Sequence, residues 1–153
     1  MNALELKVPP PVAALGVALA MWGAARLVTP LEIGLYARVA GTAAIAVVGG
    51  AFSLTAIAAF RKAKTTVNPM KPEAASALVT GGVYRITRNP MYVGLTCVLL
   101  AWAVFLAVPW ALLGPVAFMA YVTRFQIVPE ERALASAFGT DYRDYTASVR
   151  RWL

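Results

Sequence analysis

The chain of 153 residues contains no histidine and one cysteine, Cys97. A single cysteine excludes a framework of disulfides within the chain, and we expect Cys97 to be a packing residue inside an apolar run. Without histidine, the usual ligand sets for zinc are missing as well. The sequence therefore predicts neither a disulfide-stapled domain nor a zinc centre.

Charged residues are also scarce. They make up 14% of the chain and hydrophobic residues 60%, against about 25% and roughly 45–50% in soluble proteins. A soluble core of this size cannot hide so much apolar surface, so a lipid bilayer is the expected solvent. Acidic residues are outnumbered by basic ones, 7 against 14, and we assign this excess to anionic headgroups rather than to nucleic acid.

The first two apolar runs are each long enough to cross a membrane as a helix. They cover residues 12–29 and residues 39–60, and the second contains no charge. Small residues allow helices to approach closely in lipid, so Gly41, Gly49 and Gly50 predict a helix contact on the second run.

The later apolar run is too long for one crossing. Residues 89–123 carry no charge, and as a single helix they would extend about 52 Å, against a hydrocarbon core of about 30 Å. Pro109 divides the run. We therefore expect a tight hairpin of two transmembrane helices, residues 91–108 and 110–127.

The basic residues lie mostly on one side of this four-span arrangement. Twelve fall on the side of the two termini, against only Arg26 and Arg38 on the other. The positive-inside rule then predicts cytoplasmic termini. Residues 61–88 would form a cytoplasmic loop, which Pro69 and Pro72 keep extended.

The chain turns polar in residues 129–153. Pro129 at the start, acids in the first turn and Gly139 as a stop are typical of a helix. Beyond it, residues at helical spacing predict an amphipathic helix lying at the interface: Tyr142, Tyr145, Val149 and Trp152. The predicted fold is one all-α integral membrane domain over residues 1–153, with four transmembrane helices and a C-terminal interfacial helix.

Polar groups gather in two clusters on the cytoplasmic side, residues 81–92 (GGVYRITRNPMY) and residues 124–131. Because a hairpin returns the chain to the side it left, the clusters can meet. A site between the clusters would combine a flexible glycine-containing backbone with arginines, aromatic faces and two carboxylates. Such a site suits a polar, zwitterionic cofactor held beside lipid. Each feature also has a structural explanation, as membrane anchors, interfacial aromatics and helix-start acids. These alternatives stay open on composition and spacing alone.

The motif GGVYRITRNPMYVG, followed after an apolar hairpin by PEERALASAFGTDYRDY, resembles the superfamily of isoprenylcysteine carboxyl methyltransferases and phospholipid methyltransferases. The resemblance covers roughly residues 75–153. It implies a multi-pass membrane enzyme that transfers a methyl group from S-adenosyl-L-methionine to a lipophilic substrate in the bilayer, leaving S-adenosyl-L-homocysteine. The positive-inside prediction places this cofactor site on the cytoplasmic side, and the placement of the basic residues predicts no nucleic-acid partner.

The resemblance also assigns residues. The implied cofactor-binding residues are Ser76, Ala77, Leu78, Val79, Tyr84, Asn89, Pro90, Met91, Tyr92 and Glu130. Glu130 would pair with the ammonium of the cofactor. Asn89 stands where the prenylcysteine enzymes have histidine. Gln126 stands where they have an arginine for the substrate, and Arg124 is close enough to replace it, so both are expected to bind substrate.

Methyl transfer is a displacement that mainly requires in-line positioning. A carboxylate acceptor needs no base, whereas a lipid amine must first lose a proton. Since Glu130 is assigned to the cofactor, Glu131 would be the catalytic base. Two alternatives from other classes are a nonenzymatic helical scaffold and an NADPH-dependent membrane reductase of related fold, for which Arg85 and Arg88 would supply the phosphate site.

Overall fold

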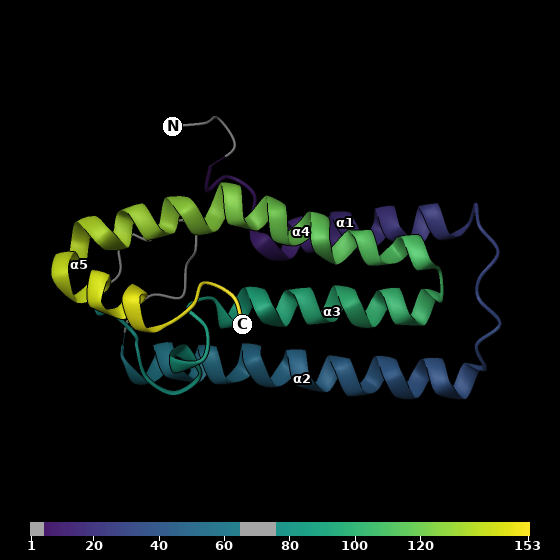
Figure 1. The fold of residues 1–153 in the computed structure, drawn as a ribbon, viewed down its shortest axis with the longest axis horizontal. Coiled ribbons are helices and arrows are strands. Elements are labelled where there is room, and N and C mark those ends of the chain that lie inside the picture. Colours follow the sequence, from purple (N-terminus) through teal and green to yellow (C-terminus); the bar gives the residue numbers. More distant parts are fainter. Residues whose placement is uncertain (1–4, 65–75) are drawn as a thin grey trace.

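The computed structural model describes residues 5–64 and 76–153. Helices dominate these ranges and no strand occurs in them (Figure 1). The helices are α1 (Pro10–Ala25), α2 (Leu35–Lys62), η2 (Gly82–Arg85), α3 (Pro90–Leu106), η3 (Pro109–Leu112), α4 (Leu113–Val122), η4 (Thr123–Ile127) and α5 (Val128–Ser148). The all-helical prediction is confirmed for the described residues. Pro69 and Pro72 of the predicted loop 61–88 lie outside them.

The long helices run side by side, with α3 in contact with α1, α2 and α4 (Figure 1). The described N-terminal segment from Glu5, the C-terminus and α5 lie at one end of the bundle, and the α1–α2 and α3–α4 connections lie at the other. Within the described ranges, two helical stretches are long and apolar enough to cross a membrane, Leu35–Lys62 and Pro109–Ser148, while α1 and α3 are shorter apolar helices. The four-span topology remains a prediction that this arrangement fits.

Helices α2 and α3 meet through glycine. A Cβ added to Gly49 would lie 2.7 Å from Cys97 Cβ and 2.9 Å from the Gly94 carbonyl oxygen. One added to Gly41 would lie 3.3 Å from Val104 Cγ1, whereas one added to Gly50 meets nothing within 4 Å. The predicted helix contact is therefore confirmed for Gly49 and Gly41 and wrong for Gly50, and Cys97 is the packing residue that its apolar surroundings predicted.

The stretch from α4 to α5 does not end at Pro129, contrary to the expected end of a span at residue 127. It passes through η4, a π-helical turn in which the Val128 N–H donates to the Thr123 carbonyl. Pro129 has no N–H, so a carbonyl in the preceding turn loses its helical donor. The Leu6 N–H replaces that donor, reaching the Phe125 carbonyl at 3.0 Å.

Gly139 interrupts α5 with φ 51° and ψ −115°, so the predicted stop is a kink after which the helix resumes. The resumed helix ends at Ser148 and Val149 is extended, which corrects the prediction of a helix through Trp152. The reason lies outside the helix, because the tail is bound elsewhere: the Arg88 N–H donates to the Arg150 carbonyl at 2.9 Å.

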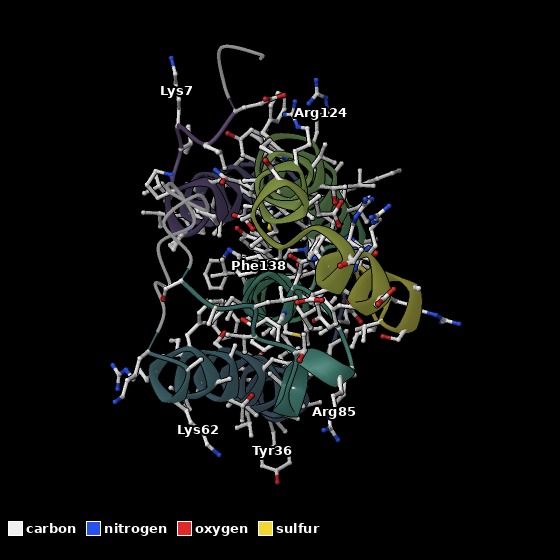
Figure 2. All side chains as sticks on the ribbon, turned by 90° about the vertical axis from the view of Figure 1, so that its left-hand side faces the viewer. Lys7, Tyr36, Lys62, Arg85, Arg124 and Phe138 are labelled. Atoms are coloured by element: carbon white, nitrogen blue, oxygen red, sulfur yellow. The ribbon has the colours of Figure 1, made fainter. Side chains whose placement is uncertain are left out.

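Tyr142 and Tyr145 do form one face of that helix, but the face is turned inward. Both side chains are buried in a cluster with Ala56 of α2 and Tyr84 of η2. The amphipathic pattern thus packs α5 against the end of the bundle. Figure 2 looks along the bundle from this end. The Phe138 side chain lies near the centre of the view, whereas Lys62 points outward.

Candidate active site

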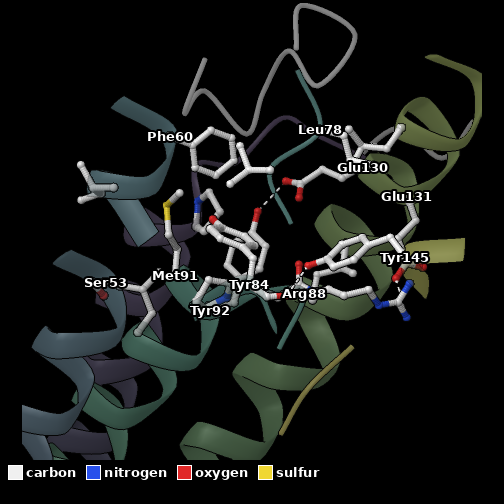
Figure 3. Close-up of a pocket in the computed structure, with 18 of the residues that line it drawn as sticks. Ser53, Phe60, Leu78, Tyr84, Arg88, Met91, Tyr92, Glu130, Glu131 and Tyr145 are labelled. Atoms are coloured by element: carbon white, nitrogen blue, oxygen red, sulfur yellow. Dashed lines mark hydrogen bonds and ion pairs between the residues drawn. The ribbon is translucent and has the colours of Figure 1, made fainter. Parts of the chain in front are cut away.

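A cavity of about 600 Å³ (Figure 3) lies at the end of the bundle that carries α5 and the C-terminal tail. Its walls come from the starts of α1, α3 and α5, the last turns of α2 and the segment before η2. Most of its lining is apolar, including Ile57, Phe60 and Leu95. Polar groups converge at one side, which is the usual character of a site for a small ligand.

Glu130 and Tyr92 form the polar centre of this cavity. The Tyr92 hydroxyl donates to Glu130 Oε1 at 2.5 Å, although the two residues are far apart in sequence. Each sits in the first turn of its helix, close after a proline: Tyr92 is two residues after Pro90 in α3, and Glu130 directly follows Pro129 in α5. The hairpin therefore does bring the two sequence clusters into contact.

Tyr84 is fixed from both sides. Its ring packs edge-on against Phe60 with centroids 5.5 Å apart, and its carbonyl accepts a hydrogen bond of 2.7 Å from the Tyr145 hydroxyl. Gly82 begins η2 with φ +63°, a left-handed conformation that glycine adopts without strain. Burial, reinforced by Tyr145 and Glu130, raises the pKa of Tyr84, so the phenol is a neutral hydroxyl.

Glu131 lines the cavity but is held by two arginines. Arg151 binds it through both nitrogens of a fork, Nε to Oε1 at 2.9 Å and Nη2 to Oε2 at 2.7 Å. Arg88 Nη2 lies 3.4 Å from Oε1. The hydrogen bond to Glu131 raises the pKa of Arg151. Both carboxylate oxygens of Glu131 are therefore engaged by arginine.

Asn89 lines the cavity, and its side chain also fastens the C-terminal tail. Its Nδ2 donates to the Arg151 carbonyl at 3.0 Å, and the Thr87 hydroxyl donates to the same oxygen at 3.1 Å. The Asn89 N–H in turn donates to the Thr87 Oγ1 at 3.2 Å. An amide suits this position because it donates to a carbonyl at any pH.

Most of the residues predicted to bind cofactor line this one cavity: Ala77, Leu78, Val79, Tyr84, Asn89, Pro90, Met91, Tyr92 and Glu130. Ser76 does not line it, and its hydroxyl donates to the Lys64 carbonyl at 3.5 Å. Gathering in one cavity is what a shared binding role requires. The individual roles stay predictions.

The two predicted substrate residues lie outside the cavity, against the N-terminal segment. Arg124 Nη1 binds Glu5 Oε1 at 3.0 Å, and Gln126 Nε2 donates to the Val8 carbonyl at 2.7 Å. Gln126 is fully buried by these neighbours. A substrate in the cavity would not reach either side chain in this arrangement.

Several cavity residues were not assigned to the site from the sequence. Six of them lie outside the quoted motifs: Pro9, Pro10, Pro11, Ser53, Ile57 and Phe60. Three lie within the motifs but were given no role in the cavity: Arg88, Tyr142 and Tyr145. Arg88 was considered only as an anchor or as a phosphate ligand. The tyrosine spacing in the C-terminal helix was a usable signal, because it identified an apolar face. Nothing in the sequence placed the proline run Pro9–Pro11 beside that face.

The arginines named for a reductase do not form a common site. Arg88 is held by Glu131, and Arg85 projects away from the bundle (Figure 2). The cavity therefore offers no paired cations for a nicotinamide phosphate among the residues that were proposed for it.

Comparison with known proteins agrees with the motif. The model of the phospholipid methyltransferase family matches residues 36–141, more than half of the chain. A protein of Haemophilus influenzae (strain ATCC 51907 / DSM 11121 / KW20 / Rd), described as uncharacterized, is 46% identical over 63 residues, which are 41% of this chain and 100% of that relative. No solved structure gives a significant match. The resemblance is thus confirmed, and the chain belongs to the phospholipid methyltransferase family, a family of membrane methyltransferases.

Proposed function

We propose that the protein is an S-adenosyl-L-methionine-dependent methyltransferase that acts on a lipophilic substrate dissolved in the membrane. The observation that carries this proposal is the Glu130 carboxylate, bound by Tyr92 at the polar side of an otherwise apolar cavity. A polar cofactor and an apolar substrate can share such a space. Family membership supports the reaction type.

The residues present fit the cofactor. A cavity of about 600 Å³ is within the range of roughly 300–1,000 Å³ that small-molecule sites occupy. Glu130 would hold the ammonium, and the aromatic faces of Tyr84 and Tyr92 suit a cation nearby. The segment Ala77 to Val79 would supply backbone groups. When bound, the cofactor would supply an electrophilic methyl group on a sulfonium.

The acceptor remains a carboxylate or an amine in this proposal. Glu131 was expected to be the base for an amine, but its two ion pairs favour a positioning role, in which it holds Arg88 and Arg151 beside the cavity. A carboxylate acceptor needs no base. An amine acceptor would then release its proton to water or to Glu130.

We place the cavity on the cytoplasmic side. The protein is a membrane protein by its family and its apolar helices. Basic side chains surround the end that carries the cavity, as Lys7, Lys62, Arg85 and Arg124 show in Figure 2. Positive residues favour the cytoplasmic face, so this end would face the cytoplasm, where the cofactor is available.

Calorimetric titration of the detergent-purified protein with S-adenosylhomocysteine tests the proposal. We expect saturable binding that NADPH does not compete for. An absence of heat and of thermal stabilisation at millimolar ligand would overturn the cofactor assignment. Competition by NADPH would instead support the reductase alternative.

A further inference from the structure

Residues 5–11, ahead of the family match, lie along the π-helical turn η4. The Leu6 N–H donates to the Phe125 carbonyl at 3.0 Å, and the Val8 carbonyl accepts from Gln126 Nε2 at 2.7 Å. Both partners belong to η4. The segment therefore binds the turn through its backbone on either side of Lys7.

Glu5 binds the helix on both sides of Pro129. Its Oε1 lies 3.0 Å from Arg124 Nη1, and its Oε2 lies 2.6 Å from Arg132 Nη2. The Glu5 side chain is only 4% exposed, whereas those of Arg124 and Arg132 are 50% and 55% exposed. One buried carboxylate thus bridges Arg124, five residues before the proline, to Arg132, three residues after it.

The π-turn is what brings the two arginines into line. They are eight residues apart, and in a regular α-helix such residues point about 80° apart around the axis. The additional residue in a π-turn makes them equivalent to residues about seven apart, which lie nearly on one face. A bridge through Glu5 is therefore compatible with the π-turn and is strained in a regular helix.

The direction of Glu130 depends on the same turn. If η4 relaxed to a regular α-helix, the part that follows would rotate by about 100° relative to α4. Glu130 lies three residues beyond η4 and points into the cavity toward Tyr92 (Figure 3). The cavity wall includes Pro9, Pro10 and Pro11, so the segment that holds the turn also closes the site.

We propose that residues 5–11 act as a splint across the π-turn, and that Glu5 is a positioning residue that directs Glu130 into the cavity. The inference rests on the proposed function, because the cofactor is assigned to Glu130 there. It gives a role to Arg124 and Gln126, whose side chains face the splint and not the substrate space. It also makes the site dependent on a segment that precedes the family match.

The test compares wild type, Glu5→Gln and the matched control Glu32→Gln, whose carboxylate is exposed at the other end of the bundle. Hydrogen exchange of residues 123–132 and affinity for S-adenosylhomocysteine are measured on the full chain in detergent. We expect Glu5→Gln to accelerate exchange there and to weaken binding by about fivefold to thirtyfold, the effect of a small loss of free energy. Glu32→Gln should change neither quantity.

A double-mutant cycle tests the bridge itself. Arg132→Gln should also weaken binding. The double variant Glu5→Gln with Arg132→Gln should lose no more affinity than the larger single effect, because Glu5→Gln already removes the ion pair that Arg132→Gln removes. Glu5→Asp, which keeps the charge, should recover part of the affinity. Additive losses, or no recovery with aspartate, would overturn the bridge.

The outcomes separate this inference from the proposed function. If wild type fails to bind S-adenosylhomocysteine, the proposed function is overturned, while the exchange of residues 123–132 still tests the splint. If wild type binds and Glu5→Gln alters neither exchange nor affinity, the splint is overturned. A lower melting temperature with unchanged affinity of the folded protein would reduce Glu5 to a structural residue and overturn the positioning role.

Discussion

The hydroxyl of Tyr92 lies 2.5 Å from Glu130 Oε1, joining the first turn of α3 to the first turn of α5. The hydrogen bond lies at the polar side of the cavity. It connects the two sequence motifs that carry the family resemblance. It leaves the second oxygen of Glu130 available to a ligand as far as the described residues show, with Tyr92 as a donor that orients the carboxylate. Two substitutions separate these contributions.

Glu130→Gln should weaken the binding of S-adenosylhomocysteine by about 2–5 kcal/mol, the range for removing one side of a desolvated charge pair. Tyr92→Phe keeps the ring and removes the donor, so its effect should be smaller, about 1–3 kcal/mol. Calorimetry on both variants measures the difference. Losses no larger than that of Glu32→Gln, at an exposed position, would contradict the assignment of Glu130.

Glu131→Gln should act mainly on stability, because its carboxylate is the shared partner of Arg88 and Arg151. The pair with Arg151 is partly exposed, so we expect a loss of about 0.5–2 kcal/mol in the free energy of unfolding. Arg151→Lys is the matched variant, since it keeps the charge but not the two-nitrogen fork. Thermal unfolding measures the stability of both variants, and calorimetry measures their affinity for S-adenosylhomocysteine. A loss of affinity in Glu131→Gln as large as that in Glu130→Gln would contradict the positioning role.

The sequence predicted the centre of the site because its chemistry is local. Tyr84, Asn89 and Tyr92 lie within the one motif GGVYRITRNPMYVG, and the hairpin argument placed the cluster that contains Glu130 beside it. Polar groups at the end of a membrane span are excluded from the hydrocarbon core, so they gather at the membrane interface. The family resemblance then assigned Tyr84, Tyr92 and Glu130 to one site, together with the backbone from Ala77 to Val79.

The roles of Arg124 and Gln126 depended on contacts that no sequence pattern contains. Their partners, Glu5 and Val8, are more than a hundred residues away in the chain. The passage of the helix through Pro129 has the same origin, because the Leu6 N–H replaces the donor that proline lacks. Local rules predicted a helix start at Pro129, and a tertiary hydrogen bond overrode them.

Gly49→Ala should destabilise the contact between α2 and α3. The added Cβ would lie 2.7 Å from Cys97 Cβ and 2.9 Å from the Gly94 carbonyl oxygen, so the helices would have to separate. Overpacking of this kind costs about 1–3 kcal/mol. Gly50→Ala is the neighbouring control, because its Cβ would meet nothing within 4 Å and alanine favours a helix. Equal melting temperatures for the two variants would contradict the close approach.

The membrane orientation is tested by labelling introduced cysteines with an impermeant maleimide in sealed vesicles of both orientations. Cys97→Ser first removes the native thiol with little change in volume, which matters because Cys97 packs beside Gly49. Cysteines are then introduced one at a time at the exposed positions Lys64, Ser148 and Glu32.

Lys64 follows α2 and Ser148 ends α5 at the cavity end of the bundle, whereas Glu32 lies in the α1–α2 connection at the opposite end (Figure 1). We expect cysteines at positions 64 and 148 to react only when the cytoplasmic face is exposed, and position 32 only from the other face, because basic residues crowd the cavity end. Reaction of positions 64 and 148 from opposite faces would contradict the four-span arrangement. Reaction of both from the outer face would keep that arrangement and reverse the orientation, separating the cavity from a cytoplasmic cofactor.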